Sequence, residues 1–324
     1  MHLRASCSVN DQCTAAVPTA AAEYPLLMTY SIVARDPETG RFGIAVQSHF
    51  LGVGPVVPWL EAGVGAVATQ ASVNTAFGPM GLELLRSGHD AEEVVAMLVA
   101  TDPLRETRQV AVVDARGRAA AHTGTGCIPA FGHVIGDGFS VQGNLLRADA
   151  VWQSMATAYE GAAGEPFWKR LLLTLDAAEA NGGDVRGRQS AALVIVAAEV
   201  AEDPAEGRVL DVRVDDHADP LGELRRLATI SEAYRLVGEL ESPATDQRPM
   251  DERYAEARAM APDAMELVFW RAIELATSGN EGAARDELAI AFDADPTWRD
   301  ALRHVAAAGL VGTDPALVER LLAE

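Results

Sequence analysis

Thr29 is the residue of this sequence that could combine a nucleophile with its own base. It follows Met28, and an initiator methionine is normally removed when the next residue is small. The α-amine of a Thr29 freed in this way titrates at about 7.7–8.0, so part of it is neutral at physiological pH and accepts the proton of the hydroxyl group on the same residue. This chemistry requires a chain that begins at Thr29. The alternative is that Met28 and Thr29 form an ordinary internal dipeptide.

A β-hairpin is expected to position this threonine. Residues Thr29–Val33 are β-branched or aromatic, which is typical of a strand, and the sequence Asp-Pro-Glu-Thr-Gly that follows shortly after them is typical of a turn. A second strand is predicted over Arg41–Gln47. Ser48 follows this strand directly, and Gln70 ends a further short strand predicted over Val64–Gln70. Both polar residues are candidate substrate contacts.

Donors for a developing oxyanion are predicted at the end of a glycine-rich stretch. Glycines recur from Gly124 to Gly143, which indicates a loop, and Asn144 follows directly. The backbone N–H of Gly143 and the side-chain amide of Asn144 could together stabilise an oxyanion. The alternative is a turn that requires a positive φ at Gly143.

Two arginines are candidates for binding a substrate carboxylate. Arg186 and Arg188 flank Gly187 at the entrance of an apolar strand predicted over Ala191–Ala197. A guanidinium group binds a carboxylate through two parallel hydrogen bonds, which gives such a contact its specificity. Surface arginines close to a turn are, however, often only solvated.

Composition narrows the possible partners and compartments. The chain has 324 residues, 49% of them hydrophobic, and a formal net charge of −21, so we expect a soluble globular protein that binds neither nucleic acid nor membrane. Cys7, Cys13 and Cys127 are odd in number and lack the spacing of zinc ligands, which favours a reducing cytoplasm without a disulfide framework or a bound metal. No cofactor is expected. No continuous apolar run near the N-terminus resembles a signal peptide.

The remaining elements alternate between hairpins and helix pairs, which predicts an α+β fold with helices covering antiparallel sheets. A second hairpin is predicted from the run of apolar residues on both sides of Ala115-Arg116-Gly117, and a capping box is predicted at Asp90 and Glu93. The predicted helices span 77–86, 90–100, 149–160, 165–180 and 219–237, and the predicted strands of the later part span 109–114, 118–123, 191–197 and 209–214.

The C-terminal part is expected to be a separate helical region. Pro262 and Pro296 lie 34 positions apart, which is the period of tetratricopeptide repeats. Helices predicted over Glu266–Ser278 and Glu281–Asp293 resemble one tetratricopeptide hairpin. The predicted domains are a leader over 1–28, a main domain over 29–240 that ends before a polar linker at 241–247, and a tetratricopeptide-like region over 241–324.

Two other clusters of reactive residues are alternatives to Thr29 as the functional site. Asp215, Asp216 and His217, with His49, could bind a metal, but neighbouring side chains of a strand point to opposite faces. Ser48 and His49 could form a serine nucleophile and its base, but adjacent side chains of an extended segment diverge.

Several motifs, in order, resemble a bacterial and archaeal family of unknown function numbered 1028. They are Thr-Tyr-Ser-Ile-Val-Ala-Arg-Asp-Pro-Glu-Thr-Gly from Thr29, Gln-Gly-Asn-Leu-Leu from Gln142, and Gly-Gly-Asp-Val-Arg-Gly-Arg-Gln-Ser-Ala-Ala-Leu from Gly182. The resemblance runs to about Tyr234. Members of that family resemble N-terminal nucleophile hydrolases in fold, which implies a four-layer αββα sandwich. It also implies that Thr29 corresponds to the residue after the initiator methionine, although the 27 residues before Met28 depart from the family pattern.

Two functions from different classes follow. The first is an amidohydrolase of the N-terminal nucleophile type that acts on a small amide or peptide-like substrate, with Thr29 as nucleophile, Asn144 and Gly143 as oxyanion donors, and Arg186 or Arg188 as carboxylate binders. The second is a non-catalytic binding protein whose C-terminal helices recruit a protein partner. A homo-oligomer is compatible with either.

Overall fold

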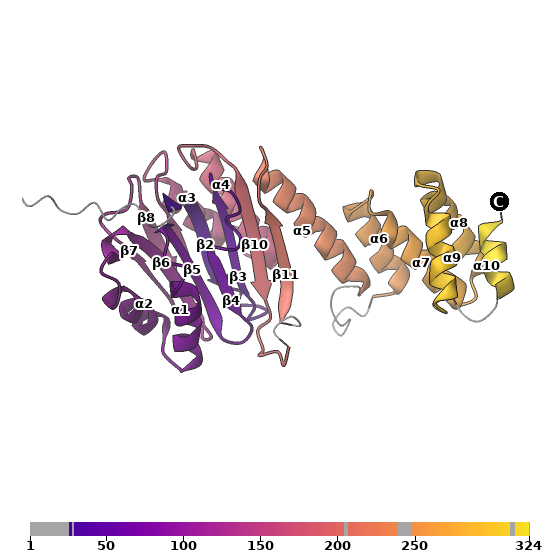
Figure 1. Cartoon of the computed structure of the whole chain (residues 1–324), viewed down its shortest axis with the longest axis horizontal. Helices are drawn as coiled ribbons and strands as arrows, with labels where there is room; N and C mark the ends of the chain where they lie inside the picture. The colour runs from indigo at the N-terminus through magenta and orange to yellow at the C-terminus, as the bar shows by residue number, and fades with distance from the viewer. Residues whose placement is uncertain (1–25, 28, 204–206, 239–247, 312–314, 324) are drawn as a thin grey trace, which may run out of the picture.

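The computed structural model describes residues 26–27, 29–203, 207–238, 248–311 and 315–323, which form an α+β unit followed by a series of helices (Figure 1). The α+β unit contains two antiparallel sheets, and the described residues include ten α-helices. The mixed fold class predicted from the sequence is therefore confirmed. The predicted leader lies outside the described residues, except for Leu26–Leu27, and so does the predicted linker at 241–247.

Sheet B has six strands in the order β11-β10-β3-β2-β9-β8 and holds Thr29 at the first position of β2. The predicted hairpin is formed by β2 and β3, with Thr29 in register with Ser48. The bounds of the strands are β2 Thr29–Arg35, β3 Phe42–Ser48, β8 Gly132–Gly136, β9 Phe139–Gly143, β10 Ser190–Val196 and β11 Arg208–Val214.

Sheet A has five strands arranged around β5. Strand β6 lies along one edge of β5 from Gly65 to Ala71, so β4 and the short β1 share the other edge at its two ends. The predicted second hairpin is formed by β6 and β7. The bounds of the strands are β1 Leu26–Leu27, β4 Pro58–Glu61, β5 Gly65–Ser72, β6 Arg108–Asp114 and β7 Ala119–Thr123.

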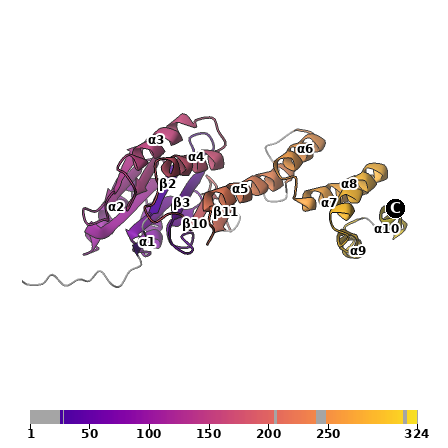
Figure 2. The ribbon, with the colours of Figure 1, turned by 90° about the horizontal axis from the view of Figure 1, so that it is seen from above.

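Three hydrophobic clusters separate four layers, with the two sheets between two sets of helices (Figure 2). One cluster joins the two sheets, a second joins sheet A to α1 and α2, and a third joins sheet B to α3, α4 and α5. The bounds of these helices are α1 Phe77–Arg86, α2 Ala91–Ala100, α3 Val151–Gly161, α4 Phe167–Ala180 and α5 Pro220–Val237. The predicted capping box at the start of α2 is present.

Strand β2 is buried on both faces, and its alternation decides where Thr29 points. Tyr30 and Ile32 belong to the cluster under the helices, whereas Val33 belongs to the cluster between the sheets. Because side chains alternate along a strand, Thr29 and Ser31 share the face of Val33. Their hydroxyl groups therefore lie between the two sheets.

The prediction of a loop over Gly124–Gly143 was wrong for its second half, because β8 and β9 form a hairpin over 132–143. Glycine serves close packing in these strands. A Cβ atom on Gly132 would lie 2.6 Å from the Trp152 ring, and one on Gly143 would lie 2.5 Å from Leu146 Cδ1. The glycines therefore admit neighbouring side chains against the strands.

The C-terminal helices pack in two clusters. The first joins the end of α5 to α6 and to the start of α7, through contacts that include Leu236, Ala257 and Leu267. The second contains residues of α7, α8, α9 and α10. The predicted helical hairpin is formed by α7 and α8. The helices are α6 Met250–Met260, α7 Met265–Thr277, α8 Glu281–Ala294, α9 Trp298–Ala307 and α10 Pro315–Leu322. Within the described residues, no helix is both long and apolar enough to cross a membrane.

Candidate active site

Thr29 is fully buried where the ends of several strands meet between the two sheets. Its Oγ1 donates to Ser48 Oγ at 3.1 Å. Its carbonyl oxygen accepts from Asn144 N at 3.1 Å and from Gln70 Nε2 at 3.2 Å. Three other candidates from the sequence, Ser48, Gln70 and Asn144, are thus brought together around Thr29.

Gln109 on β6 connects these residues and was missed by the sequence analysis. Its Oε1 accepts from Gln70 Nε2 at 2.7 Å and from Asn144 Nδ2 at 3.0 Å. Its Nε2 donates toward Gly143 O at 2.9 Å and Thr123 Oγ1 at 3.0 Å. The signal in the sequence was a glutamine directly before the apolar run Val110–Val113, and it gave no partners because these come from separate segments.

A second branch of the network runs along sheet B. Ser31 Oγ donates to Gln70 Oε1 at 2.6 Å and accepts from Gln142 Nε2 at 2.7 Å, and Ser140 Oγ donates to Gln142 Oε1 at 2.9 Å. All four side chains are buried. Each unsatisfied buried polar group costs about 1–3 kcal/mol, so a connected network of this kind fixes the orientation of every amide within it.

The network ends at His133 on β8. Its Nδ1 lies 2.8 Å from Thr123 Oγ1. Burial lowers the pKa of His133, and the neighbouring His122 lowers it further.

Backbone strain is concentrated beside this cluster. Among the described residues, the only non-glycine positions with positive φ are Ala71, at 68°, and Leu145, at 49°. They directly follow Gln70 and Asn144. Strain of this kind costs about 1–3 kcal/mol per residue and collects at functional sites, where the surrounding structure enforces it. The two outliers therefore mark the cluster independently of its side chains.

Gly143 lies within sheet B rather than in a loop. It is in register with Tyr30 on one side and with Gly132 on the other, and its carbonyl accepts from Gln109. The backbone N–H of Asn144 is directed to Thr29 O. The side-chain amide of Asn144, one of the two predicted oxyanion donors, carries two hydrogens and gives one to Gln109.

The two predicted carboxylate binders lie outside this cluster and contact carboxylates of the protein. Arg186 holds Asp184 through Nε–Oδ1 at 3.1 Å and Nη2–Oδ2 at 2.7 Å, and the Asp184 side chain is fully buried. Arg188 is about half exposed and pairs with Glu179 at 3.0 Å and with Asp219 at 3.1 Å. Binding of a substrate carboxylate by either arginine would require exchange of these partners.

A second polar group lies behind Thr29, on the helix-covered face of sheet B. The Tyr30 hydroxyl contacts Glu179 of α4 and Gln47 of β3. Burial raises the pKa of Tyr30 well above its usual value, and the charge of Glu179 raises it further. Tyr30 therefore stays protonated and links the strand that carries Thr29 to the ion pair of Glu179 with Arg188.

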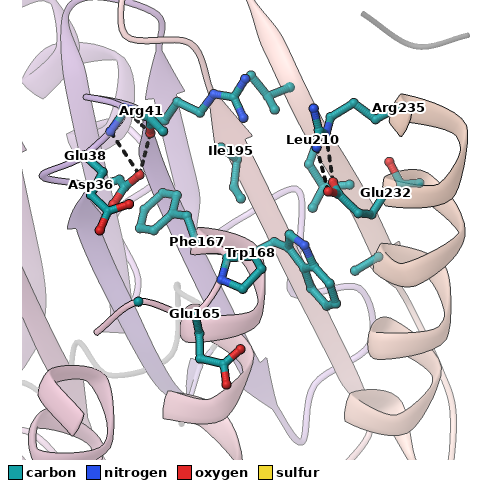
Figure 3. Close-up of a pocket in the computed structure, with 16 residues that line it drawn as sticks. Asp36, Glu38, Arg41, Glu165, Phe167, Trp168, Ile195, Leu210, Glu232 and Arg235 are labelled. Atoms are coloured by element: carbon teal, nitrogen blue, oxygen red, sulfur yellow. Dashed lines mark hydrogen bonds and ion pairs between the residues drawn. The ribbon is translucent and has the colours of Figure 1, made fainter. Parts of the chain in front are cut away.

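The cavity drawn in Figure 3 is separate from the Thr29 cluster. It has a volume of about 320 Å³ and lies between the β2–β3 turn, the start of α4, and α5, where Phe167 and Trp168 form part of its wall. It adjoins the end of β2 opposite to Thr29, so about 20 Å of strand separates the two places. Its floor includes Ile195 and Leu210, which face the helices.

The alternative metal cluster around His217 does not assemble. His217 N donates to Gln189 O, its Nδ1 accepts from Asp219 N, and Asp216 accepts from Gln189. Among the residues that the structure describes, no group of three His, Cys, Asp or Glu side chains could hold a metal ion. Cys127 is a free, buried thiol whose pKa burial raises to about 11.

A model of the family described as "Family of unknown function (DUF1028)" matches residues 29–224. The chain belongs to the DUF1028 family. Among solved structures, protein SPO2555 from Silicibacter pomeroyi, also described as DUF1028, is 33% identical, with a TM-score of 0.56 over 64% of this chain and 89% of that chain. No curated protein matches the chain. The match to DUF1028 begins at Thr29 and ends within α5, so the helices from α6 onward lie outside it.

Proposed function

We infer that this DUF1028 protein is an amidohydrolase of the N-terminal nucleophile type, active in a form that begins at Thr29. One observation carries the proposal: the threonine at the first position of β2 is buried beside a connected network of amide side chains, and its carbonyl accepts from the backbone N–H of Asn144 and from the side-chain amide of Gln70. A network of this kind fixes the position of a nucleophile to the accuracy that catalysis requires.

Three further observations support it. The order of layers, with two antiparallel sheets between two sets of helices, resembles the αββα sandwich of N-terminal nucleophile hydrolases. The match to the family begins at Thr29. Strain at Ala71 and Leu145, beside Gln70 and Asn144, is also typical of a site under functional constraint.

In the proposed reaction, Thr29 Oγ attacks the carbonyl carbon of a substrate amide, and the hydroxyl proton passes to the Thr29 α-amine. The second hydrogen of Asn144 Nδ2 stabilises the oxyanion. The C–N bond then breaks, and the proton moves from the α-amine to the leaving nitrogen. Water hydrolyses the Thr29 ester, which releases a carboxylic acid and restores the hydroxyl group.

The test is turnover of a panel of small amides by chains that begin at residue 29. Thr29→Ala should abolish turnover, whereas Thr29→Ser should keep part of it, because serine retains both the hydroxyl group and the amine. The matched control is Thr174→Ala, since Thr174 is equally buried, lies in α4 and bonds only within its helix. Equal turnover in Thr29→Ala and the parent chain would refute the proposal.

A further inference from the structure

Strand β1, which consists of Leu26 and Leu27, pairs with an edge of β5 in sheet A. Leu26 pairs with Ser72 and Leu27 pairs with Ala71, in antiparallel orientation. Thr29 itself belongs to sheet B. The chain therefore passes from the edge of sheet A to sheet B directly at the candidate active site.

On this edge of β5, only the end at Ala71 and Ser72 lies beyond the part that β4 covers. Strand β4 covers the same edge from Gly65 to Ala68, and Thr69 N donates to Val57 O. Ala71 and Ser72 are the β5 residues that pair with β1. A chain that begins at Thr29 lacks β1 and leaves their backbone groups as an open strand edge, which is a template for an added strand.

The open edge is held in place by contacts that do not depend on β1. The guanidinium group of Arg108, itself almost fully buried, donates to Ser72 O and Ser72 Oγ. Arg108 is fixed in turn by Asp102, which accepts from its Nε at 2.8 Å. On its other edge, Ala71 remains in register with Arg108 of β6. The strand end is therefore rigid before a ligand arrives.

The position of β1 identifies what this edge would bind. Leu26 and Leu27 lie on the acyl side of the peptide bond that precedes Thr29. A substrate attacked by Thr29 Oγ places its carbonyl carbon beside the same residue, so its acyl portion extends into the space that β1 occupies in the full chain. Pairing along β5 requires alternating N–H and C=O groups at the spacing of an extended peptide.

We propose that the edge of β5 at Ala71–Ser72 is the acyl-binding slot of the Thr29 site and that it takes an extended peptide with at least three residues before the bond that is cleaved, since Leu27 and Leu26 are the second and third residues before Thr29. This assignment rests on the proposed function, because the edge is an acyl slot only if Thr29 is the nucleophile. In the full chain, β1 fills the slot.

The experiment uses a chain that begins at Thr29. Its fold is expected to persist, because the match to the DUF1028 family begins at Thr29 and all six strands of sheet B lie at or after this residue. The probe is a synthetic peptide amide with the sequence of residues 20–27. Its matched control carries methyl groups on both leucine nitrogens, which removes those two donors. The readout is hydrogen exchange at Ala71 and Ser72, with exchange in β11 at the far edge of sheet B as the internal control.

We expect the unmodified peptide to slow exchange at Ala71–Ser72 at least tenfold and to leave β11 unchanged, whereas the methylated peptide should change exchange less than twofold. Full-length chain should already be protected at this edge and should not respond. If neither peptide slows exchange at Ala71–Ser72, or if both slow it equally, the proposed slot is contradicted. If the chain hydrolyses an amide but the peptide does not slow exchange at Ala71–Ser72, the hydrolase proposal stands and the slot is contradicted. If the peptide slows exchange but no amide is hydrolysed, the hydrolase proposal is contradicted and the edge only binds peptide.

Discussion

Thr29 Oγ1 and Ser48 Oγ face each other at 3.1 Å across the β2–β3 hairpin, and neither residue is exposed to solvent. Ser48 therefore restrains the position of the Thr29 Oγ1 atom. A nucleophile whose hydroxyl rotates freely would spend less time in the geometry that the reaction needs.

Replacing Ser48 with Ala should therefore affect activity more than folding. The lost hydrogen bond should lower the free energy of unfolding by about 0.5–1.5 kcal/mol in urea titrations. Turnover by a chain that begins at Thr29 should fall at least tenfold. Ser154→Ala is the matched control, because Ser154 bonds backbone carbonyls of α3 and α4 far from Thr29. Unchanged turnover in Ser48→Ala would separate Ser48 from the reaction.

Gln109→Leu should be among the most destabilising substitutions in the α+β unit. It removes the acceptor shared by Gln70 and Asn144 and leaves those buried amides without this partner. We expect a loss of at least about 2 kcal/mol in the free energy of unfolding, measured by urea denaturation. Gln189→Leu is the control, since its partner Asp216 is exposed, and it should cost less than about 0.5 kcal/mol. If Gln109→Leu also lowered the free energy of unfolding by less than about 0.5 kcal/mol, Gln109 would not be the centre of the network.

His133 should make stability depend on pH below about neutrality. Burial lowers its pKa in the folded chain below the ordinary value of 6.5, so the unfolded chain binds a proton that the folded chain does not. The contribution of neutral His133 is therefore fully present above pH 6.5 and is lost as pH falls toward the lowered pKa. His133→Gln should flatten the dependence of the melting temperature on pH in this window. The same slope in both chains would show that His133 does not titrate in this way.

The two arginines should behave differently when changed to Lys. Arg186→Lys loses the paired hydrogen bonds to the buried Asp184 and should lower the free energy of unfolding by about 1–3 kcal/mol. Arg188→Lys changes exposed ion pairs and should cost less than about 1 kcal/mol. Thermal and urea unfolding of both variants check this. If Arg188→Lys instead loses substrate binding with unchanged stability, the arginine binds substrate, as the sequence analysis predicted.

The sequence predicted the elements whose signals are local. The β2–β3 hairpin, the capping box of α2 and the α7–α8 pair each depend on residues close together in the chain. The β8–β9 hairpin was missed, because its glycines resemble a loop and their close packing against Trp152 and Leu146 depends on how residues outside the hairpin fold back onto it.

The same limit applies to the candidate site. The motifs around Thr29 and Asn144 were visible, and Ser48 and Gln70 were named, but nothing in their spacing shows that one glutamine on β6 joins them. The pairing of Arg186 with Asp184 was equally hidden, although the two residues are only two positions apart, because a flexible side chain leaves many directions open. Networks of side chains from separate strands appear only once the sheets are assembled.

The central claim is that the working protein begins at Thr29. The most direct test is the intact mass and N-terminal sequence of the protein purified from its natural host. We expect a chain whose first residue is Thr29 with a free α-amine, whether Met28 was an initiator that was trimmed or residues 1–28 were removed together. A mature chain that keeps Met1, or any residue before Thr29, would tie the α-amine in a peptide bond and contradict the proposed mechanism.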